Sequence, residues 1–161
     1  AIVSEVEQND DVLFKPLFSY EMVGICSKDH PLANKEVWQA EDFAEETWVT
    51  YPVPDDMLDL YRQVLKPKGI NPPRRTTELT IALIQLVASR RGIATVPYWA
   101  ALPYLEKGYV VARKITEEGL YSNLYAAIRK EDANLAYIED FHQTVKAQSF
   151  STLPGLSVLE L

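Results

Sequence analysis

The sequence predicts an α/β fold with a largely parallel sheet, because segments typical of strands alternate with segments typical of helices along the chain. Two long extended segments, 13–27 and 120–129, are rich in apolar residues and bracket the middle of the chain. The simplest architecture that accounts for both observations is a central lobe inserted between the two ends of a second lobe.

Composition and charge restrict the class of protein. A chain of 161 residues with 47% hydrophobic and 24% charged residues can bury a core as one domain or two small lobes. Its formal net charge of −7 argues against this chain holding DNA itself. No apolar stretch approaches the roughly 20 residues of a membrane helix, and we expect no export signal. A single cysteine fits a reducing compartment, the cytoplasm.

The first third of the chain reads mainly as strands. The opening residues 1–4 are expected to form a buried strand that pairs with a segment outside this chain. The extended segment 13–27 ends at the turn 29–31, and Cys26 within it is expected to be a buried thiol rather than a nucleophile. A short strand follows at 47–51.

The middle of the chain predicts two helices. Asp55 or Asp56 can cap the first, which has an apolar stripe of Met57, Leu58, Tyr61, Val64 and Leu65. After a strand at 75–78, the helix 79–89 has hardly any polar face and is expected to be buried on most sides. Gly92 is expected to cap its end.

The last third alternates again. A buried strand is expected at 93–96, a helix opened by Pro97 and running through Leu105, and a strand at 109–112. The second long extended segment, 120–129, leads to a final helix. That helix carries an apolar stripe of Leu135, Ile138, Phe141 and Val145.

Several motifs give the sequence a family resemblance. The segment 83–97, a buried helix, a glycine and a short strand ending in proline, resembles the effector domain of LysR-type transcriptional regulators, and 29–33 is another habitual feature of that family. A narrower similarity, to the methionine-biosynthesis activators of the family, is carried by Tyr51-Pro52-Val53, Leu65-Lys66-Pro67 with Gly69, and Glu118-Gly119-Leu120-Tyr121-Ser122 leading into 124–129.

This resemblance implies a two-lobed, periplasmic-binding-protein-like fold with a small-molecule cleft between the lobes and two crossover strands as hinge. Residues 1–19 and 126–161 would be the remainder of lobe I, whose first strands and helices are missing, and 20–125 would be lobe II. It further implies a homocysteine effector, activation of methionine-biosynthesis genes, self-association as a dimer or tetramer, and DNA contact only through a missing N-terminal domain. No cofactor, metal or membrane partner is expected.

Ligands of an open α/β lobe bind at the carboxyl ends of the strands, against helix N-termini. Strand ends are expected at Ser4, at Thr50-Tyr51-Pro52, at Thr76-Thr77-Glu78 and at Pro97-Tyr98. For an amino acid, helix amides with the Ser4 or Thr77 hydroxyl suit the carboxylate, and Glu78 suits the ammonium. Tyr51 and Tyr98 can form walls. The candidate effector-binding residues are therefore Ser4, Tyr51, Pro52, Thr77, Glu78 and Tyr98.

Other interpretations stay open at this point. Helix capping alone accounts for Thr77 and Glu78, and Tyr51 and Tyr98 could be core aromatics. Leu79 departs from the family, which often has a small polar residue there. A periplasmic-type solute-binding protein for a small amino acid would share the same cleft. An enzyme on the same fold finds no support, since the sequence has no catalytic motif and only two distant histidines.

Overall fold

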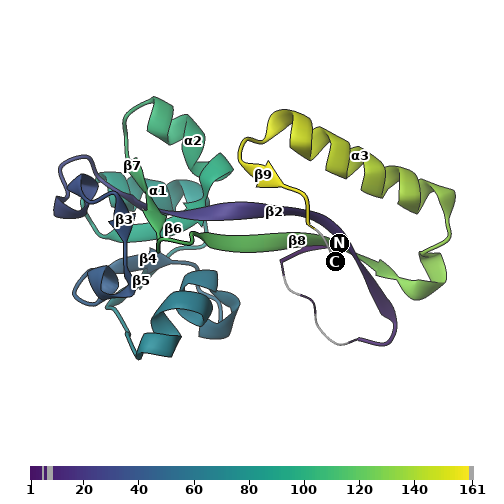
Figure 1. The fold of residues 1–161 in the computed structure, drawn as a ribbon, viewed down its shortest axis with the longest axis horizontal. Coiled ribbons are helices and arrows are strands. Elements are labelled where there is room, and N and C mark those ends of the chain that lie inside the picture. The colour runs from purple at the N-terminus through teal and green to yellow at the C-terminus, as the bar shows by residue number, and fades with distance from the viewer. Residues whose placement is uncertain (5, 7–8, 160–161) are drawn as a thin grey trace. The chain divides into compact units, whose positions relative to one another are not determined.

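The computed structural model describes residues 1–4, 6 and 9–159. The chain forms two compact units: unit 1 comprises residues 1–20 and 121–161, and unit 2 comprises residues 21–120. Strands β2 (Val12–Cys26) and β8 (Leu120–Arg129) run from one unit into the other (Figure 1). These are the two extended segments expected from the sequence, and their bounds confirm that expectation within one residue.

The sheet of unit 2 is mixed rather than largely parallel. Its strands follow the order β2, β6 (Ile93–Pro97), β4 (Trp48–Thr50) and β5 (Arg74–Thr76), and β7 (Val111–Ile115) pairs with β2 and with β3 (Val37–Trp38). The pairs β4–β5, β4–β6 and β3–β7 are parallel, but β2 is antiparallel to β6 and β7. The expectation of a largely parallel sheet was wrong because apolar periodicity identifies a strand without giving its direction.

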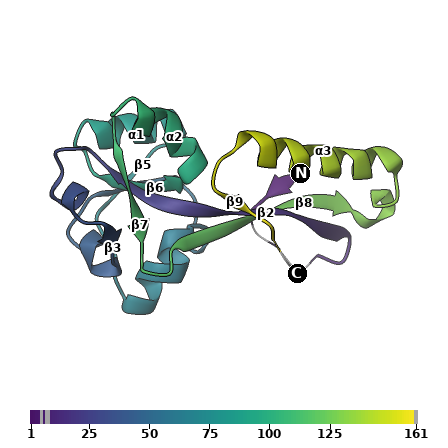
Figure 2. The same ribbon diagram turned by 45° about the horizontal axis from the view of Figure 1, so that its top comes forward.

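Both faces of this sheet carry a core. Helices α1 (Thr80–Ala88) and α2 (Tyr98–Glu106) cover one face, as Figures 1 and 2 show. Neighbouring strand residues alternate between the faces: Val49 and Ala94 pack under the helices, whereas Trp48 and Ile93 belong to the opposite core. The short helices η1 (Pro31–Asn34) and η2 (Ala40–Phe43) and the segment 55–68 contribute to that opposite core.

Helix α1 is buried on one side only. Leu83, Ile84 and Val87 are buried, but Ile81 is 56% exposed. The expectation that the helix is buried on most sides was therefore wrong. A helix of nine residues rests a single stripe on the sheet, and apolar residues outside that stripe face outward.

The helix expected after residue 55 is broken into short turns. Two 3₁₀ turns, η3 (Asp55–Met57) and η5 (Lys66–Lys68), flank a π-helical turn, η4 (Tyr61–Leu65). Pro54 occupies the N-cap position, so the predicted capping by Asp55 or Asp56 was wrong. Both carboxylates form ion pairs instead, Asp55 with Arg74 and Asp56 with Lys66.

Gly92 is required by a close approach of two chain segments, not by a helix cap. The C-cap of α1 is Ser89, and Gly92, the residue before β6, has φ 152°. A Cβ at Gly92 would overlap the carbonyl oxygen of Thr47 and lie 2.9 Å from a Val49 methyl carbon. The absence of a side chain lets Ile93 N–H donate to that Thr47 oxygen at 2.9 Å, which sets β6 beside β4.

Unit 1 combines a small antiparallel sheet with one long helix. Strand β1 (Ile2–Val3) pairs with β8, and β9 (Leu156–Ser157) pairs with β2. The opening strand was expected to be buried and paired outside this chain; it pairs with β8, and Ile2 is 50% exposed. The turn η6 (Lys130–Asp132) leads from β8 toward α3 (Ala136–Thr152).

Helix α3 packs along β2 within unit 1 (Figure 2). Lys15 pairs with Glu139 at 2.5 Å, the Nε2 atom of His142 lies 3.0 Å from the Pro16 carbonyl oxygen, and Phe150 meets Phe18 edge to face. The predicted apolar stripe is less buried than expected, since Phe141 is 52% exposed. No helix among the described residues is long and apolar enough to cross a membrane.

Candidate functional site

The carboxyl ends of β4 and β5 lie side by side in unit 2. The two strands are parallel with Thr50 opposite Thr76, and the Thr77 N–H donates to the Thr50 carbonyl oxygen at 3.0 Å. Tyr51 and Thr77 are therefore the first residues beyond two neighbouring strand ends. The expectation that these positions come together is confirmed by this pairing.

Strand β6 brings a third end to the same edge. It runs parallel to β4 on the side opposite β5 and ends at Pro97, so Tyr98 follows at its carboxyl end. Tyr51 and Tyr98 are both half-buried, and both pack against the core beneath α1 and α2. Each ring thus packs partly against the core and is partly exposed, and its contact with an effector stays a prediction.

The Tyr51 hydroxyl is held by the first residue of α1. Its oxygen lies 2.7 Å from the Thr80 Oγ1, and either hydroxyl can be the donor. Sequence reasoning missed Thr80, because the rule that ligands bind at strand ends does not select the first turn of the following helix. The signal available was a hydroxyl residue two positions after Glu78, at the start of the apolar helix.

Neither Thr77 nor Glu78 caps α1. Leu79 occupies the N-cap position, and the helix has no side-chain cap. Thr77 is engaged through its backbone N–H, as described above. Glu78 is exposed, and among the described residues its carboxylate has no hydrogen bond or ion pair. The capping interpretation was therefore wrong for both residues, and the Glu78 carboxylate is available for a cation.

The nearby cation Arg74 has its own partners. Its guanidinium lies 5.1 Å from the ring centroids of both Trp48 and Tyr61 and also pairs with the Asp55 carboxylate. Arg74 thus ties β5 to the segment that precedes it and is not free to bind a ligand carboxylate. Hydroxyls and backbone amides at the strand ends are the donors proposed for such a carboxylate.

Ser4 lies in unit 1, whereas the other five candidates lie in unit 2. It is exposed and directly follows β1. A contact between Ser4 and an effector stays a prediction.

Cys26 is not suited to nucleophilic chemistry. The side chain at the end of β2 is fully buried, and burial raises the pKa of its thiol to about 11, against an opposing effect of Arg113. The expectation of a buried structural thiol is confirmed. Within the described ranges, no group of three or more His, Cys, Asp or Glu side chains could hold a metal ion.

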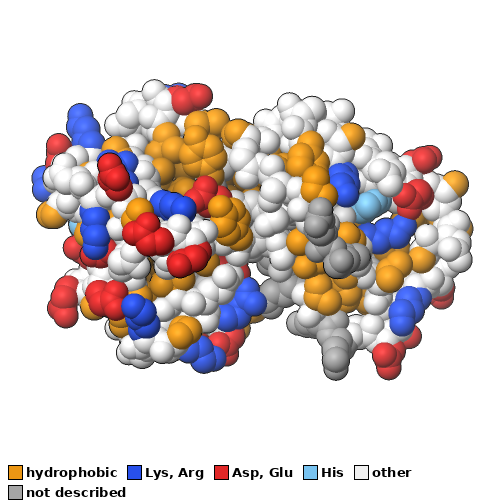
Figure 3. Space-filling view, in the orientation of Figure 1, with side chains coloured by type: hydrophobic (Ala, Val, Ile, Leu, Met, Phe, Trp, Pro, Cys, Tyr) orange, Lys and Arg blue, Asp and Glu red, His pale blue; other side chains and the backbone are white. Residues whose placement is uncertain are grey.

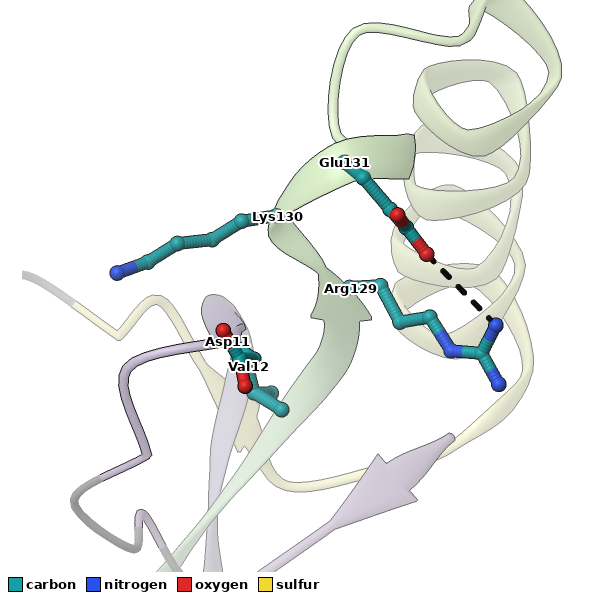
Figure 4. Close-up of a pocket in the computed structure, with 5 residues that line it drawn as sticks. All are labelled: Asp11, Val12, Arg129, Lys130 and Glu131. Atoms are coloured by element: carbon teal, nitrogen blue, oxygen red, sulfur yellow. Dashed lines mark ion pairs between the residues drawn. The ribbon is translucent and has the colours of Figure 1, made fainter.

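A separate pocket of about 420 Å³ lies in unit 1, lined by Asp11, Val12, Arg129, Lys130 and Glu131. Figure 4 shows Arg129 and Glu131 pointing toward one another, 3.9 Å apart, with Lys130 directed away from them. All four charged residues are exposed, and the two acids balance the two bases. The pocket therefore has neither the burial nor the charge excess that would select a ligand.

The surface of unit 2 carries charges of both signs. On the face seen in Figure 3, Lys and Arg side chains are interspersed with Asp and Glu, and apolar side chains gather over the region of α2. Many of the basic residues are paired, for example Lys66 with Asp56 and Lys68 with Glu41. A continuous basic stripe of the kind that binds a phosphate backbone is not visible on this face.

Comparison with known proteins identifies related sequences. Residues 1–149 match the family described as LysR substrate binding domain. The HTH-type transcriptional regulator MetR of Haemophilus influenzae is 84% identical over 161 residues, which is 100% of this chain and 52% of that protein. The protein of the same name from Salmonella typhimurium is 36% identical over 153 residues, or 95% of this chain and 48% of that protein. The chain thus spans about half the length of these curated relatives.

Solved structures agree with these matches. The regulatory domain of MetR, a LysR family regulator from N. meningitidis, has a TM-score of 0.93 and 64% identity, over 99% of this chain and 74% of that one. The effector binding domain of QuiR, solved in complex with shikimate, has a TM-score of 0.76 at 22% identity, over 94% of this chain and 72% of that one. The second likeness shows the fold alone.

Proposed function

Since this chain belongs to the LysR substrate binding domain family, we propose that it is the sensor of an activator of methionine biosynthesis and that its effector is homocysteine. The relatives are transcriptional regulators rather than enzymes or transport proteins, and they carry the name MetR. That name supports the methionine connection. The family and the relatives favour the regulator over the solute-binding protein considered above.

The observation that carries the choice of an amino acid is the unpaired carboxylate of Glu78 beside hydroxyl groups at neighbouring strand ends. An α-amino acid needs an acceptor for its ammonium, donors for its carboxylate and an apolar wall for its side chain. Glu78 supplies the acceptor, and the rings of Tyr51 and Tyr98 supply the wall. Thr77 and Pro52 border the same edge. A thiol-bearing side chain, being weakly polar, suits an aromatic wall.

The rest of the regulator completes this function. Because the curated relatives are about twice as long as this chain, we propose that DNA is contacted through sequence outside it, as the acidic net charge favours. Self-association as a dimer or tetramer belongs to the same proposal, since regulators that read paired half-sites are symmetric. A regulator of this kind acts in the cytoplasm.

Isothermal titration calorimetry on the full natural chain tests the effector. L-homocysteine is compared with L-methionine, L-cysteine and L-serine under reducing conditions. We expect homocysteine to bind more tightly than the other three. Equal affinity for all four would contradict the assignment of homocysteine while leaving an amino-acid sensor, and the absence of binding by every amino acid would overturn both.

A further inference from the structure

The hydroxyl groups of Thr80 and Tyr51 form a hydrogen-bonded pair in which one of the two hydroxyl protons is not used. Each hydroxyl has one proton, and the 2.7 Å bond between them uses only one of the two. Among the described residues, neither side chain has a second hydrogen-bond partner. One O–H donor of the pair is therefore left over at the strand-end edge, beside the residues of the proposed site.

We propose that Thr80 is a positioning residue that donates to the Tyr51 oxygen and so directs the Tyr51 proton to the carboxylate of the bound effector. This inference rests on the proposed function, because it deepens the chemistry of the same site. In the resulting chain, Thr80 Oγ1–H donates to Tyr51 Oη, and Tyr51 Oη–H donates to a carboxylate oxygen. Every proton has an acceptor, and each bond polarises the next.

The opposite direction of the hydrogen bond, from Tyr51 to Thr80, suits an amino-acid ligand less well. If Tyr51 donated to Thr80, the spare proton would belong to Thr80, and the Tyr51 oxygen would offer only lone pairs to a ligand. Those lone pairs would compete with the Glu78 carboxylate for the ammonium, and a full negative charge is the stronger acceptor. The two ends of an amino acid are therefore best served when Glu78 takes the ammonium and the hydroxyl pair takes the carboxylate.

The position of Thr80 makes this direction sensitive to a single side chain. Thr80 is half-buried at the first position of α1, and Tyr51 is half-buried against the core, so packing restricts where each hydroxyl can lie. Replacing Thr80 by Val keeps the shape and removes the donor. Replacing it by Ser keeps the donor and removes a methyl group.

The experiment measures binding by calorimetry in the full natural chain. Three variants, Thr80→Val, Thr80→Ser and Tyr51→Phe, are compared with the parent. We expect Thr80→Val to weaken the binding of L-homocysteine about tenfold, because it removes a hydrogen bond from the chain that ends at the ligand's carboxylate. We expect the affinity of Thr80→Ser to be within about threefold of that of the parent. The double variant that combines Thr80→Val with Tyr51→Phe should bind L-homocysteine no more weakly than Tyr51→Phe alone, because the two hydroxyls act as one unit.

Two truncated probes separate carboxylate recognition from a structural role. The Thr80→Val penalty should persist for 4-mercaptobutanoate, which lacks the ammonium, and vanish for 3-aminopropane-1-thiol, which lacks the carboxylate. If Thr80 had only a structural role, Thr80→Val would lower the melting temperature of the ligand-free protein and leave its affinity for homocysteine unchanged. That result would overturn this inference. An equal penalty for both probes would also overturn it. If the parent binds none of these compounds, the proposed function itself fails, and this inference fails with it.

Discussion

Replacing Glu78 by Gln removes the negative charge proposed to hold the effector's ammonium while keeping the size of the side chain. A hydrogen bond between charged groups contributes about 1.5–3 kcal/mol, which corresponds to about a 10- to 150-fold rise in Kd. Glu78 is exposed in the ligand-free chain, so the upper value applies only if the bound ligand excludes water from the carboxylate. The melting temperature of the ligand-free protein should not change, because this carboxylate has no partner among the described residues.

Calorimetry with homocysteine measures this effect, and Glu106→Gln serves as a matched control. Glu106 is also exposed, and it lies at the C-terminal end of α2, the end that leads away from the carboxyl end of β6. The control should bind homocysteine as the parent does. If Glu78→Gln binds as tightly as the control, the ammonium is held elsewhere, and the assignment of Glu78 is refuted. If both variants weaken binding equally, the effect is one of net charge and not of a specific contact.

Three further results are expected. Gly92→Ala should destabilise the fold by about 2–4 kcal/mol in denaturant titrations, because its Cβ meets backbone, whereas Gly108→Ala, with φ 68° and open space around the Cβ, should cost only about 1 kcal/mol. Cys26, with a pKa of about 11, should resist a thiol reagent at about pH 8 in the native state and react fully after unfolding. The hydrogen bond from Gln143 and the pairing with the β2 lysine hold the pKa of Glu139 below its ordinary value. The ionised Glu139 carboxylate therefore stabilises the fold at pH values above its ordinary pKa, and this stabilisation is lost as the pH falls. In denaturant titrations, Glu139→Gln should be less stable than the parent at neutral pH and equally stable in acid.

The strands were the part of the fold best predicted from the sequence. Segments 13–27 and 120–129 correspond closely to β2 and β8, because long runs of β-branched and aromatic residues are distinctive. Strand direction was not predictable, since pairing depends on which distant segment meets which. The segment 55–68 shows a different limit. Its apolar spacing is helical, but the acids expected to cap it form ion pairs with Arg74 and Lys66, and the chain turns irregularly.

For the candidate site, the position of each residue was easier to predict than its bonding. Placing Tyr51 and Thr77 at adjacent strand ends needs only the rule for parallel strands, and β4–β5 pairing confirms it. The Tyr51–Thr80 hydrogen bond needs the rotation of α1 relative to β4, which local sequence does not determine. For the same reason, the sequence could not show whether the Glu78 side chain caps α1 or has no hydrogen-bond partner.

The start of α1 breaks a local rule that most helices obey. Its N-cap is Leu79, which is 63% exposed and cannot accept a backbone N–H, whereas Ser, Thr, Asp or Asn at this position would stabilise the helix by about 1 kcal/mol. A hydroxyl residue is present one position later, but its oxygen is engaged with Tyr51 instead of the helix amides. Departures from local rules are expected where function competes with stability. A capping side chain at position 79 would satisfy the amides of the first turn and offer the Thr80 hydroxyl an alternative partner. The apolar residue leaves that hydroxyl paired with Tyr51, and the proposed recognition of the carboxylate depends on the bond between them.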